Sequence, residues 1–227
     1  MSIEQWVERL QDRRSRRVVF LSHCLLNENT RYLGGACRPA IVREAVEFCL
    51  QHDIAIVQMP CPEQCAWGGV LKRRLLHFYG VEASWRSRVG RVVLPVMMWC
   101  TRRIYRVLAR QTAAQISDYV ASHMDVVAIV GVDGSPSCGV TRRLDVKHAF
   151  ELLGGLQPAS ARAGDVNHVV RTTQTDGPGL YVAAMNAELQ RRRLQVRFVA
   201  HDLLAELDGK PLSFRDELQS ALRSKRT

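Results

Sequence analysis

The stretch "DVVAIVGVDGSPSCGV" (residues 125–140) joins an apolar, β-branched run to a loop of glycine, proline, serine and cysteine. A continuous apolar run of this length is typical of a parallel strand that is buried on both faces. "VVAIVG" (126–131) shares this character with "RVVFLS" (17–22), "IAIVQM" (54–59) and "VRFVA" (196–200). The four runs predict four buried strands of a mainly parallel sheet.

Helical patterns lie between these runs. Apolar residues recur with helical spacing over 39–52, 103–123 and 177–194, and "VKHAFELL" (146–153) predicts a shorter helix. Strands that alternate with helices form βαβ units, in which helices cover both faces of the sheet. The predicted fold class is therefore α/β, with three layers and a Rossmann-like, mainly parallel sheet.

The chain of 227 residues is long enough for one substantial core, so we expect a single domain over 1–227. Two segments fit the alternation of strands and helices poorly. We interpret 66–100 as an insertion that carries part of a substrate wall, and 141–176 as a cover of the site or an oligomer contact. Residues 211–227 are expected to form a surface tail whose short helix frays.

Lysine and arginine outnumber aspartate and glutamate by 32 to 22, which gives a formal net charge of +10. Such a charge attracts nucleic acids and small anions. The arginines are spread along the chain without the interleaved aromatic residues of an RNA-binding module, so nucleic acid is not the favoured partner. No apolar run reaches the length of a membrane span, and the charged first residues lack the apolar core of a signal peptide. We therefore expect a cytoplasmic protein with no membrane partner.

The chain has seven cysteines, at positions 24, 37, 49, 61, 65, 100 and 138. An odd number without an export signal argues against a disulfide framework and leaves packing, nucleophilic or metal-binding roles. Cys49 lies on the apolar face of a predicted helix and Cys100 at a predicted helix start. Both are expected to be packing residues, because cysteine is readily buried.

Four cysteines directly follow predicted strands. Cys24 comes after the first strand, Cys61 and Cys65 after the second, and Cys138 after the third. The carboxyl ends of parallel strands meet at one edge of the sheet, which is where ligand sites form in such folds. We therefore expect three thiols to converge at that edge.

Two kinds of metal centre suit three thiolates. Together with His23 or His201 they would close a four-coordinate zinc site. Alone they would leave one position open, and an iron–sulfur cluster on three cysteines has one iron free to act as a Lewis acid. The spacing of the cysteines chooses neither between the two metals nor between Cys61 and Cys65 as the second ligand.

Three motifs resemble those of the thiouracil desulfidase (TudS) family. They are "LSHCLLNENTRYLGG" (21–35), "PCPEQCAWGG" (60–69) and "DGSPSCG" (133–139), and the family-like core covers roughly residues 17–140. Members of the family carry a [4Fe-4S] cluster on three cysteines. The resemblance implies a [4Fe-4S]-dependent, non-redox desulfidase that removes sulfur as hydrosulfide from a thiolated pyrimidine or related thio-heterocycle.

The resemblance also implies roles for single residues. Its metal ligands are Cys24, Cys61 and Cys138, and its acid–base pair is Glu63 and Ser135. Each member of the pair has a structural alternative, because a glutamate in this position can cap the next helix or pair with an arginine, and a serine can satisfy the loop backbone. The backbone role is expected mainly of the second serine of the loop, Ser137.

Three further residues are candidates for substrate binding. His23 would donate a hydrogen bond to the substrate, Arg31 would hydrogen-bond to the heterocycle, and Tyr32 would stack on it. The structural alternatives are a histidine without a binding role, an arginine in a surface ion pair and a tyrosine in the core. The alternative functions are a structural or regulatory zinc or iron–sulfur protein and a protein that binds thiolated RNA without turnover. The sequence leaves the oligomeric state open.

Overall fold

Four parallel strands form the central sheet of the computed structural model, which describes residues 2–10, 12–75, 85–156, 160–212 and 214–224. The strands are β1 (Arg17–Leu21), β2 (Ala55–Gln58), β3 (Asp125–Asp133) and β6 (Phe198–Asp202), and they lie in the order β2-β1-β3-β6. Val18 of β1 lies beside Ala55 of β2, and Ile129 of β3 lies beside Phe198 of β6. The four predicted strands are confirmed.

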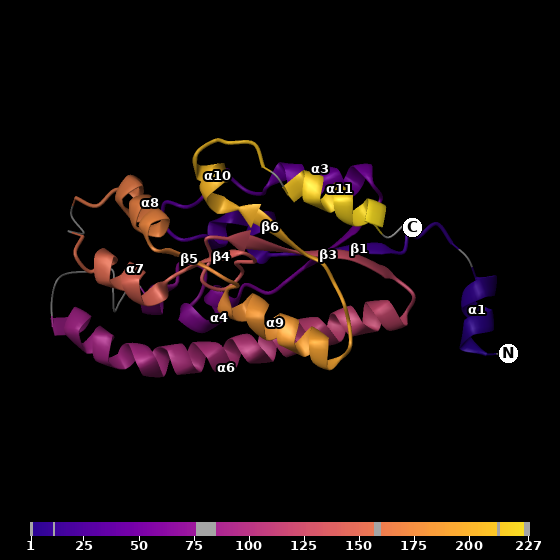
Figure 1. Cartoon of the computed structure of the whole chain (residues 1–227), viewed down its shortest axis with the longest axis horizontal. Helices are drawn as coiled ribbons and strands as arrows, with labels where there is room; N and C mark the ends of the chain where they lie inside the picture. The colour runs from indigo at the N-terminus through magenta and orange to yellow at the C-terminus, as the bar shows by residue number, and fades with distance from the viewer. Residues whose placement is uncertain (1, 11, 76–84, 157–159, 213, 225–227) are drawn as a thin grey trace.

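Helices cover both faces of this sheet (Figure 1). One face carries α3 (Arg43–Gln51) and α11 (Phe214–Ser224), and the other carries α4 (Pro62–Trp67), α6 (Trp85–Ala121) and α9 (Leu180–Arg191). Side chains alternate along a strand, so Val19 and Leu21 of β1 join the core on the first face, and Val18 and Phe20 join the core on the second. The predicted three-layer α/β architecture is confirmed.

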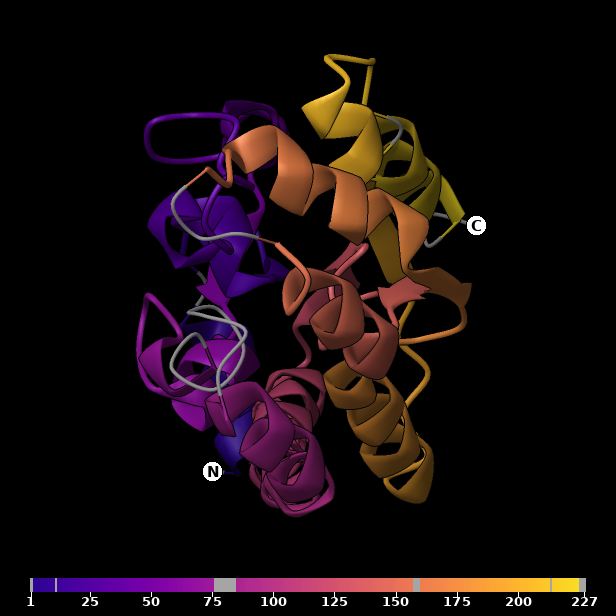
Figure 2. The same ribbon diagram turned by 90° about the vertical axis from the view of Figure 1, so that its left-hand side faces the viewer.

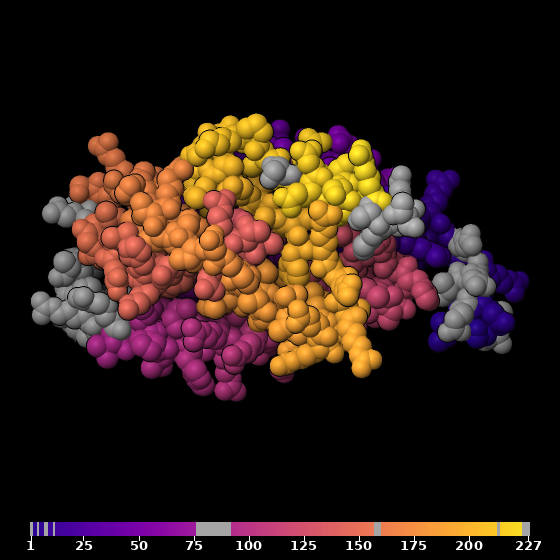
Figure 3. Space-filling model, viewed as in Figure 1, coloured from indigo at the N-terminus to yellow at the C-terminus, as the bar shows by residue number. Residues whose placement is uncertain are grey.

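A group of smaller elements stands at the carboxyl ends of the strands. β4 (Arg142–Leu144) pairs antiparallel with β5 (Gln174–Asp176), and α7 (Val146–Leu153) and α8 (Ala163–Thr172) lie in front of the sheet in Figure 2. The remaining elements are α1 (Ile3–Arg9), α2 (His23–Leu26), the 3-10 helix η1 (Glu28–Thr30) and α10 (Leu203–Leu207). In the space-filling view, α7 and α8 form the surface at one end of the molecule, and α1 lies at the other (Figure 3).

Strand β3 extends to Asp133, beyond its predicted end at residue 131. The loop that follows folds back onto its own strand, because the N–H of Val132 donates to the carbonyl oxygen of Cys138 at 2.8 Å. A Cβ atom at Gly131 would lie only 2.3 Å from that oxygen. Glycine therefore permits the close approach, and at this position it does not end the strand.

Helix α6 begins at Trp85, whereas the predicted helix began at residue 103. Among the described side chains of α6 from 92 to 100 none is fully buried, and Val92, Val96 and Trp99 are exposed. Part of the segment interpreted as an insertion, 85–100, thus belongs to the same helix as the core residues that follow it, while 76–84 lie outside the described residues. Despite the length of α6, none of the described helices combines the length and hydropathy that crossing a bilayer requires.

The expectation of a fraying surface tail at the carboxyl end is wrong for residues 214–224. Helix α11 buries Phe214, Leu218, Ala221 and Leu222 in the core on the α3 face. Their spacing of three and four residues places them on one stripe of the helix. The charged residues between them, which suggested a surface segment, occupy the opposite side of an amphipathic helix.

Candidate functional site

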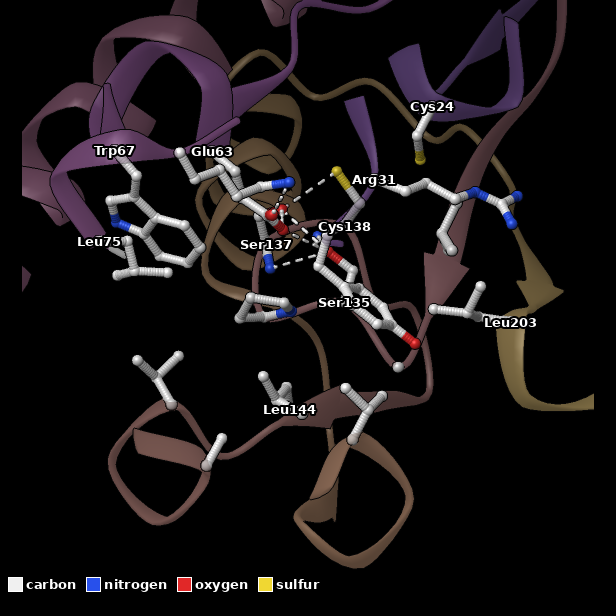
Figure 4. A pocket seen from close by; sticks show the side chains of 18 of the residues that line it. Cys24, Arg31, Glu63, Trp67, Leu75, Ser135, Ser137, Cys138, Leu144 and Leu203 are labelled. Atoms are coloured by element: carbon white, nitrogen blue, oxygen red, sulfur yellow. Dashed lines mark hydrogen bonds and ion pairs between the residues drawn. The ribbon is translucent and has the colours of Figure 1, made fainter. Parts of the chain in front are cut away.

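A pocket with a volume of about 130 Å³ lies at the carboxyl ends of the central strands (Figure 4). Cys24, Cys61 and Cys138 all line this pocket. Cys24 lies in α2 after β1, Cys61 is the N-cap of α4 after β2, and Cys138 lies in the loop after β3. Three separate strand ends thus deliver one thiol each to the same cavity.

The other cysteines lie elsewhere. Cys65 is exposed and is not among the described residues that line the pocket, so of the two thiols in α4's motif it is Cys61 that faces the site. Cys49 is buried in the core, which confirms its predicted packing role. Cys100 is exposed on the outer half of α6, and its predicted packing role is wrong because that half of the helix faces away from the core.

The loop that carries Cys138 is held rigidly from both sides. The carboxylate of Asp133 accepts hydrogen bonds from the N–H groups of Val140 and Thr141, at 2.7 and 2.9 Å. On the other side, the first N–H groups of α9 donate to loop carbonyls, with Tyr181 donating to Ser137 at 3.1 Å. Asp133 therefore stabilises the conformation of the loop. The first N–H groups of α9 are hydrogen-bonded to the loop, so they are not available to a ligand.

Burial raises the pKa of all three pocket thiols. It raises the pKa of Cys61 to about 12, with the charge of Glu63 adding to the effect. Burial raises the pKa of Cys24 and raises that of Cys138 well above its ordinary value; next to burial, the charge of Cys24 is the largest contribution at Cys138. The three thiols therefore lie close enough for the charge of one to affect the pKa of another. Their raised pKa values favour the protonated thiols unless positive charge is brought to the site.

The two histidines named as zinc ligands lie differently. His23 lines the pocket, and its Nδ1 lies 2.7 Å from the side-chain nitrogen of Gln58. His201 is fully buried and pairs through Nε2 with Glu206 at 2.8 Å. Within the described part of the chain, no three His, Cys, Asp or Glu side chains are grouped as ligands of a single metal ion. Zinc and the iron–sulfur cluster both stay predictions.

A polar network surrounds the carboxylate of Glu63 (Figure 4). Its Oε1 accepts hydrogen bonds from the hydroxyls of Ser135 and Ser137, at 3.0 and 2.9 Å. Its Oε2 pairs with the ammonium of Lys72 at 3.3 Å. Glu63 therefore does not act as the N-cap of α4, which is the side chain of Cys61. Both carboxylate oxygens are engaged by donors at the pocket.

Both loop serines contact Glu63, and Ser135 also takes the backbone role that was expected mainly of Ser137. The hydroxyl of Ser135 accepts from the N–H groups of Ser137 and Cys138, at 3.2 and 3.1 Å, so it satisfies the loop backbone as well as contacting Glu63. Ser137 is the more deeply buried of the two, and its hydroxyl lies 3.5 Å from the sulfur of Cys138. The serine expected to hold the backbone is thus the one that links the carboxylate to a pocket thiol.

Arg31 and Tyr32 line the pocket but are tied to the protein. The Arg31 guanidinium pairs with Glu206 at 2.8 Å and with Glu28 at 3.4 Å, so it is a buried ion-pair partner and not a surface one. The hydroxyl of Tyr32 donates to Asn167 of α8 at 2.8 Å. These contacts fix the loop after α2 against the rest of the fold, which leaves direct binding of a heterocycle by either residue a prediction.

The far wall of the pocket is apolar. We call Glu63, Lys72, Ser135 and Ser137 the polar floor of the pocket. The apolar side chains that line the rest of the pocket include Trp67, Leu75, Leu144, Val146, Phe150, Leu153, Val166, Val169 and Val170. Trp67 is held in place because its indole N–H donates to Thr101 of α6 at 3.1 Å. Two parts of the segment 141–176, 144–153 and 166–170, therefore cover the pocket, which agrees with the first of the two interpretations offered for that segment.

The sequence pattern did not single out Lys72, and it predicted only a backbone role for Ser137. Lys72 sits in "VLKRR", where nothing distinguishes it from its basic neighbours. Ser137 belongs to the cysteine loop, so its proximity to the site was foreseeable, but its contact with Glu63 depends on a residue of another strand end.

Neither a protein-family model, nor a curated protein, nor a solved structure matches this chain. The case for a function therefore stands on the geometry of the pocket together with the motif resemblance.

Proposed function

We propose that this chain is a non-redox desulfidase that removes sulfur from a small thiolated heterocycle, with a [4Fe-4S] cluster held by Cys24, Cys61 and Cys138. The observation that carries the proposal is the convergence of three thiols and a hydroxyl-bound carboxylate on one pocket. Sulfur donors and a proton acceptor at one cavity are what this reaction requires.

The donor set fits such a cluster. Three thiols are present at the pocket, and burial raises the pKa of each, so binding of iron would supply the positive charge that stabilises the thiolates. The cysteines of a cluster bind different irons, so they need not be grouped as ligands of one ion. When bound, the cluster would supply an iron with an open position, a soft Lewis acid suited to sulfide.

The apolar walls of the pocket suit a flat ring. The walls of Leu144, Phe150 and Val170 exclude bulk water from one side of the ring, while the polar floor faces the other. Exclusion of water strengthens the electrostatic interactions of that floor.

Glu63 is the proton carrier in this proposal. Its Oε1 accepts from two serine hydroxyls, and its Oε2 pairs with Lys72, which fixes the position of the carboxylate at the pocket. A water that attacks the thiocarbonyl carbon passes a proton to Glu63, and Glu63 returns it to the departing sulfur or to a ring nitrogen. The net change replaces C=S by C=O, water supplies the oxygen, and sulfur leaves as hydrosulfide, so no electrons are transferred.

Anaerobic reconstitution with iron and sulfide tests the proposal. The reconstituted protein is expected to contain about four irons per chain, to absorb in the visible range and to release sulfide from 2-thiouracil or 4-thiouracil. Cys138→Ala and Cys61→Ala should abolish the absorption. Cys65→Ala is the matched control, because Cys65 lies in the same helix but is exposed, and it should keep both the iron and the activity. A folded, reconstituted wild type without visible absorption would contradict the proposal.

A further inference from the structure

The side-chain ammonium of Lys72 lies at the polar floor of the pocket. The residue is 5% exposed, and its side chain lines the cavity. Its Nζ donates to the carbonyl oxygen of Thr30 at 2.7 Å and pairs with Glu63 Oε2 at 3.3 Å. A lysine is rarely buried unless it is paired, and here one carboxylate and one carbonyl hold the ammonium in place.

The ammonium has more donors than these partners use. A lysine carries three N–H donors and no acceptor, and the described residues supply two partners for Nζ. Other donors line the pocket as well. The guanidinium of Arg31 pairs with Glu28 and Glu206, while its Nε and Nη2 have no hydrogen-bond partner among the described residues, and the ring of His23 contacts Gln58 through Nδ1. Lys72 differs from both because its ammonium pairs with Glu63, so its remaining donor lies beside the proposed proton carrier.

The backbone at this position points to a role for the side chain. Lys72 has φ of +51°, in the left-handed region that favours glycine. Its N–H donates to the carbonyl oxygen of Gly69 at 2.9 Å, which closes the turn after α4. Glycine would make this turn with less strain but would leave the polar floor without its ammonium.

We propose that Lys72 determines specificity by donating its third N–H to a carbonyl oxygen of the ring. The site would then select thio-heterocycles that carry a carbonyl oxygen in addition to the thiocarbonyl, and would bind rings without that oxygen more weakly. This inference rests on the proposed function, because the selected ring is the substrate of the proposed reaction. The binding of the ring by Lys72 itself involves no sulfur chemistry. Lys72 also holds Glu63 Oε2, so a purely structural role is the competing explanation that the test must separate.

Equilibrium binding to the reconstituted protein separates the two explanations. The probes are uracil, which has carbonyl oxygens, and pyrimidine, which has none, titrated by isothermal calorimetry. In the wild type, uracil is expected to bind more tightly. Lys72→Met should reduce the ratio of the two affinities by roughly 10- to 100-fold, because a hydrogen bond to a charged donor is lost. Lys72→Arg should retain much of the ratio, because it keeps a cationic donor.

Lys210→Met is the matched control, because Lys210 is exposed and pairs with Asp208 away from the pocket. It should leave the ratio unchanged. If Lys72→Met leaves the ratio of the two affinities unchanged, for example by weakening the binding of both probes by the same factor, the proposal is overturned in favour of a structural role. If Lys72→Met does not fold, Lys72→Gln replaces it and should still lower the ratio at least roughly threefold, since a neutral donor binds more weakly than an ammonium.

The outcomes also separate this inference from the proposed function. A wild type that prefers uracil in a Lys72-dependent way, yet releases no sulfide from thiouracils, supports the role of Lys72 and contradicts the desulfidase. A protein that releases sulfide but shows the same uracil-to-pyrimidine ratio with and without Lys72 supports the desulfidase and overturns the role of Lys72.

Discussion

Two serines in one loop contribute differently to the site. Ser135 accepts hydrogen bonds from two backbone N–H groups, those of Ser137 and Cys138, and so holds the turn that presents the thiol. Ser137 makes no such backbone contact with its hydroxyl among the hydrogen bonds described, and links Glu63 to Cys138 instead. The stability of the loop and its chemistry are therefore separable by mutation.

Ser135→Ala is expected to lower the free energy of unfolding by about 1–3 kcal/mol, because two partly buried N–H groups lose their acceptor. Ser137→Ala should cost less, about 1 kcal/mol, since Glu63 keeps its bond to Ser135. Urea denaturation of the two variants and the wild type gives the comparison. A larger loss for Ser137→Ala would show that the roles assigned here are reversed.

At the scale of residues, the sequence predicts where a residue lies relative to the strands better than it predicts which side chains that residue contacts. Cys24 and Cys138 were predictable because each follows a strand, and strand ends can be recognised as local apolar runs. The choice between Cys61 and Cys65 was not, because both follow the second strand. The direction of Arg31 was not, because its guanidinium pairs with Glu206, far along the chain. Lys72 was equally hidden, since its left-handed turn and its bond to Thr30 exist only in the folded chain.

At the scale of elements, α10 is fastened to β6 and to the loop after α2 by a buried ionic cluster. Glu206 of α10 pairs with His201 of β6, with Arg31 and with Arg38. Burial, followed by the charges of Arg31 and Arg38, lowers the pKa of His201 to about 3. The histidine is therefore neutral in the fold, and donates to the carboxylate through Nε2.

This cluster makes stability depend on pH. A histidine in the unfolded chain has a pKa of about 6.5. As the pH falls below that value towards 3, the unfolded state binds a proton that the folded state does not, so the free energy of unfolding falls. Between pH 7 and pH 5 the wild type should lose about 2 kcal/mol more than His201→Gln, which cannot titrate. Urea midpoints at the two pH values measure this, and equal losses in both proteins would count against a neutral, buried His201.

Helix α11 is a second element whose contribution is measurable. Leu218 is 1% exposed and packs in the core on the α3 face. Leu218→Ala should therefore cost about 2–5 kcal/mol of stability, the usual range for a cavity left in a packed core. The control Arg223→Ala, on the exposed side of the same helix, should change stability by less than about 0.5 kcal/mol. Thermal or urea unfolding distinguishes this from a fraying tail, for which both changes would be small.

The elements themselves were predictable to the extent that they are amphipathic or uniformly buried. The four central strands and α9 follow their hydrophobic patterns closely. The outer half of α6 was missed because Val92 and Val96 face solvent and no stripe marks it. Helix α11 was misjudged for the opposite reason, since many charges on one side obscured an apolar stripe on the other.

At the scale of the whole molecule, the parallel sheet brings together residues that are far apart in the chain. Three strand ends supply the thiols, while the segment after β4 supplies the apolar cover through Phe150 and Val170. Ligand sites form at this edge of such sheets because the connections all leave from it. Most of the apolar wall thus comes from α7 and α8. Its remaining part, Trp67 and Leu75, comes from the same segment as Lys72.

The central claim is that one iron–sulfur cluster binds at this pocket. The most direct measurement is an anomalous difference map, collected at the iron absorption edge, from crystals of the anaerobically reconstituted protein. The account predicts one compact iron peak bounded by the sulfur atoms of Cys24, Cys61 and Cys138. Iron bound elsewhere, or no iron in a crystal of folded and reconstituted protein, would contradict it.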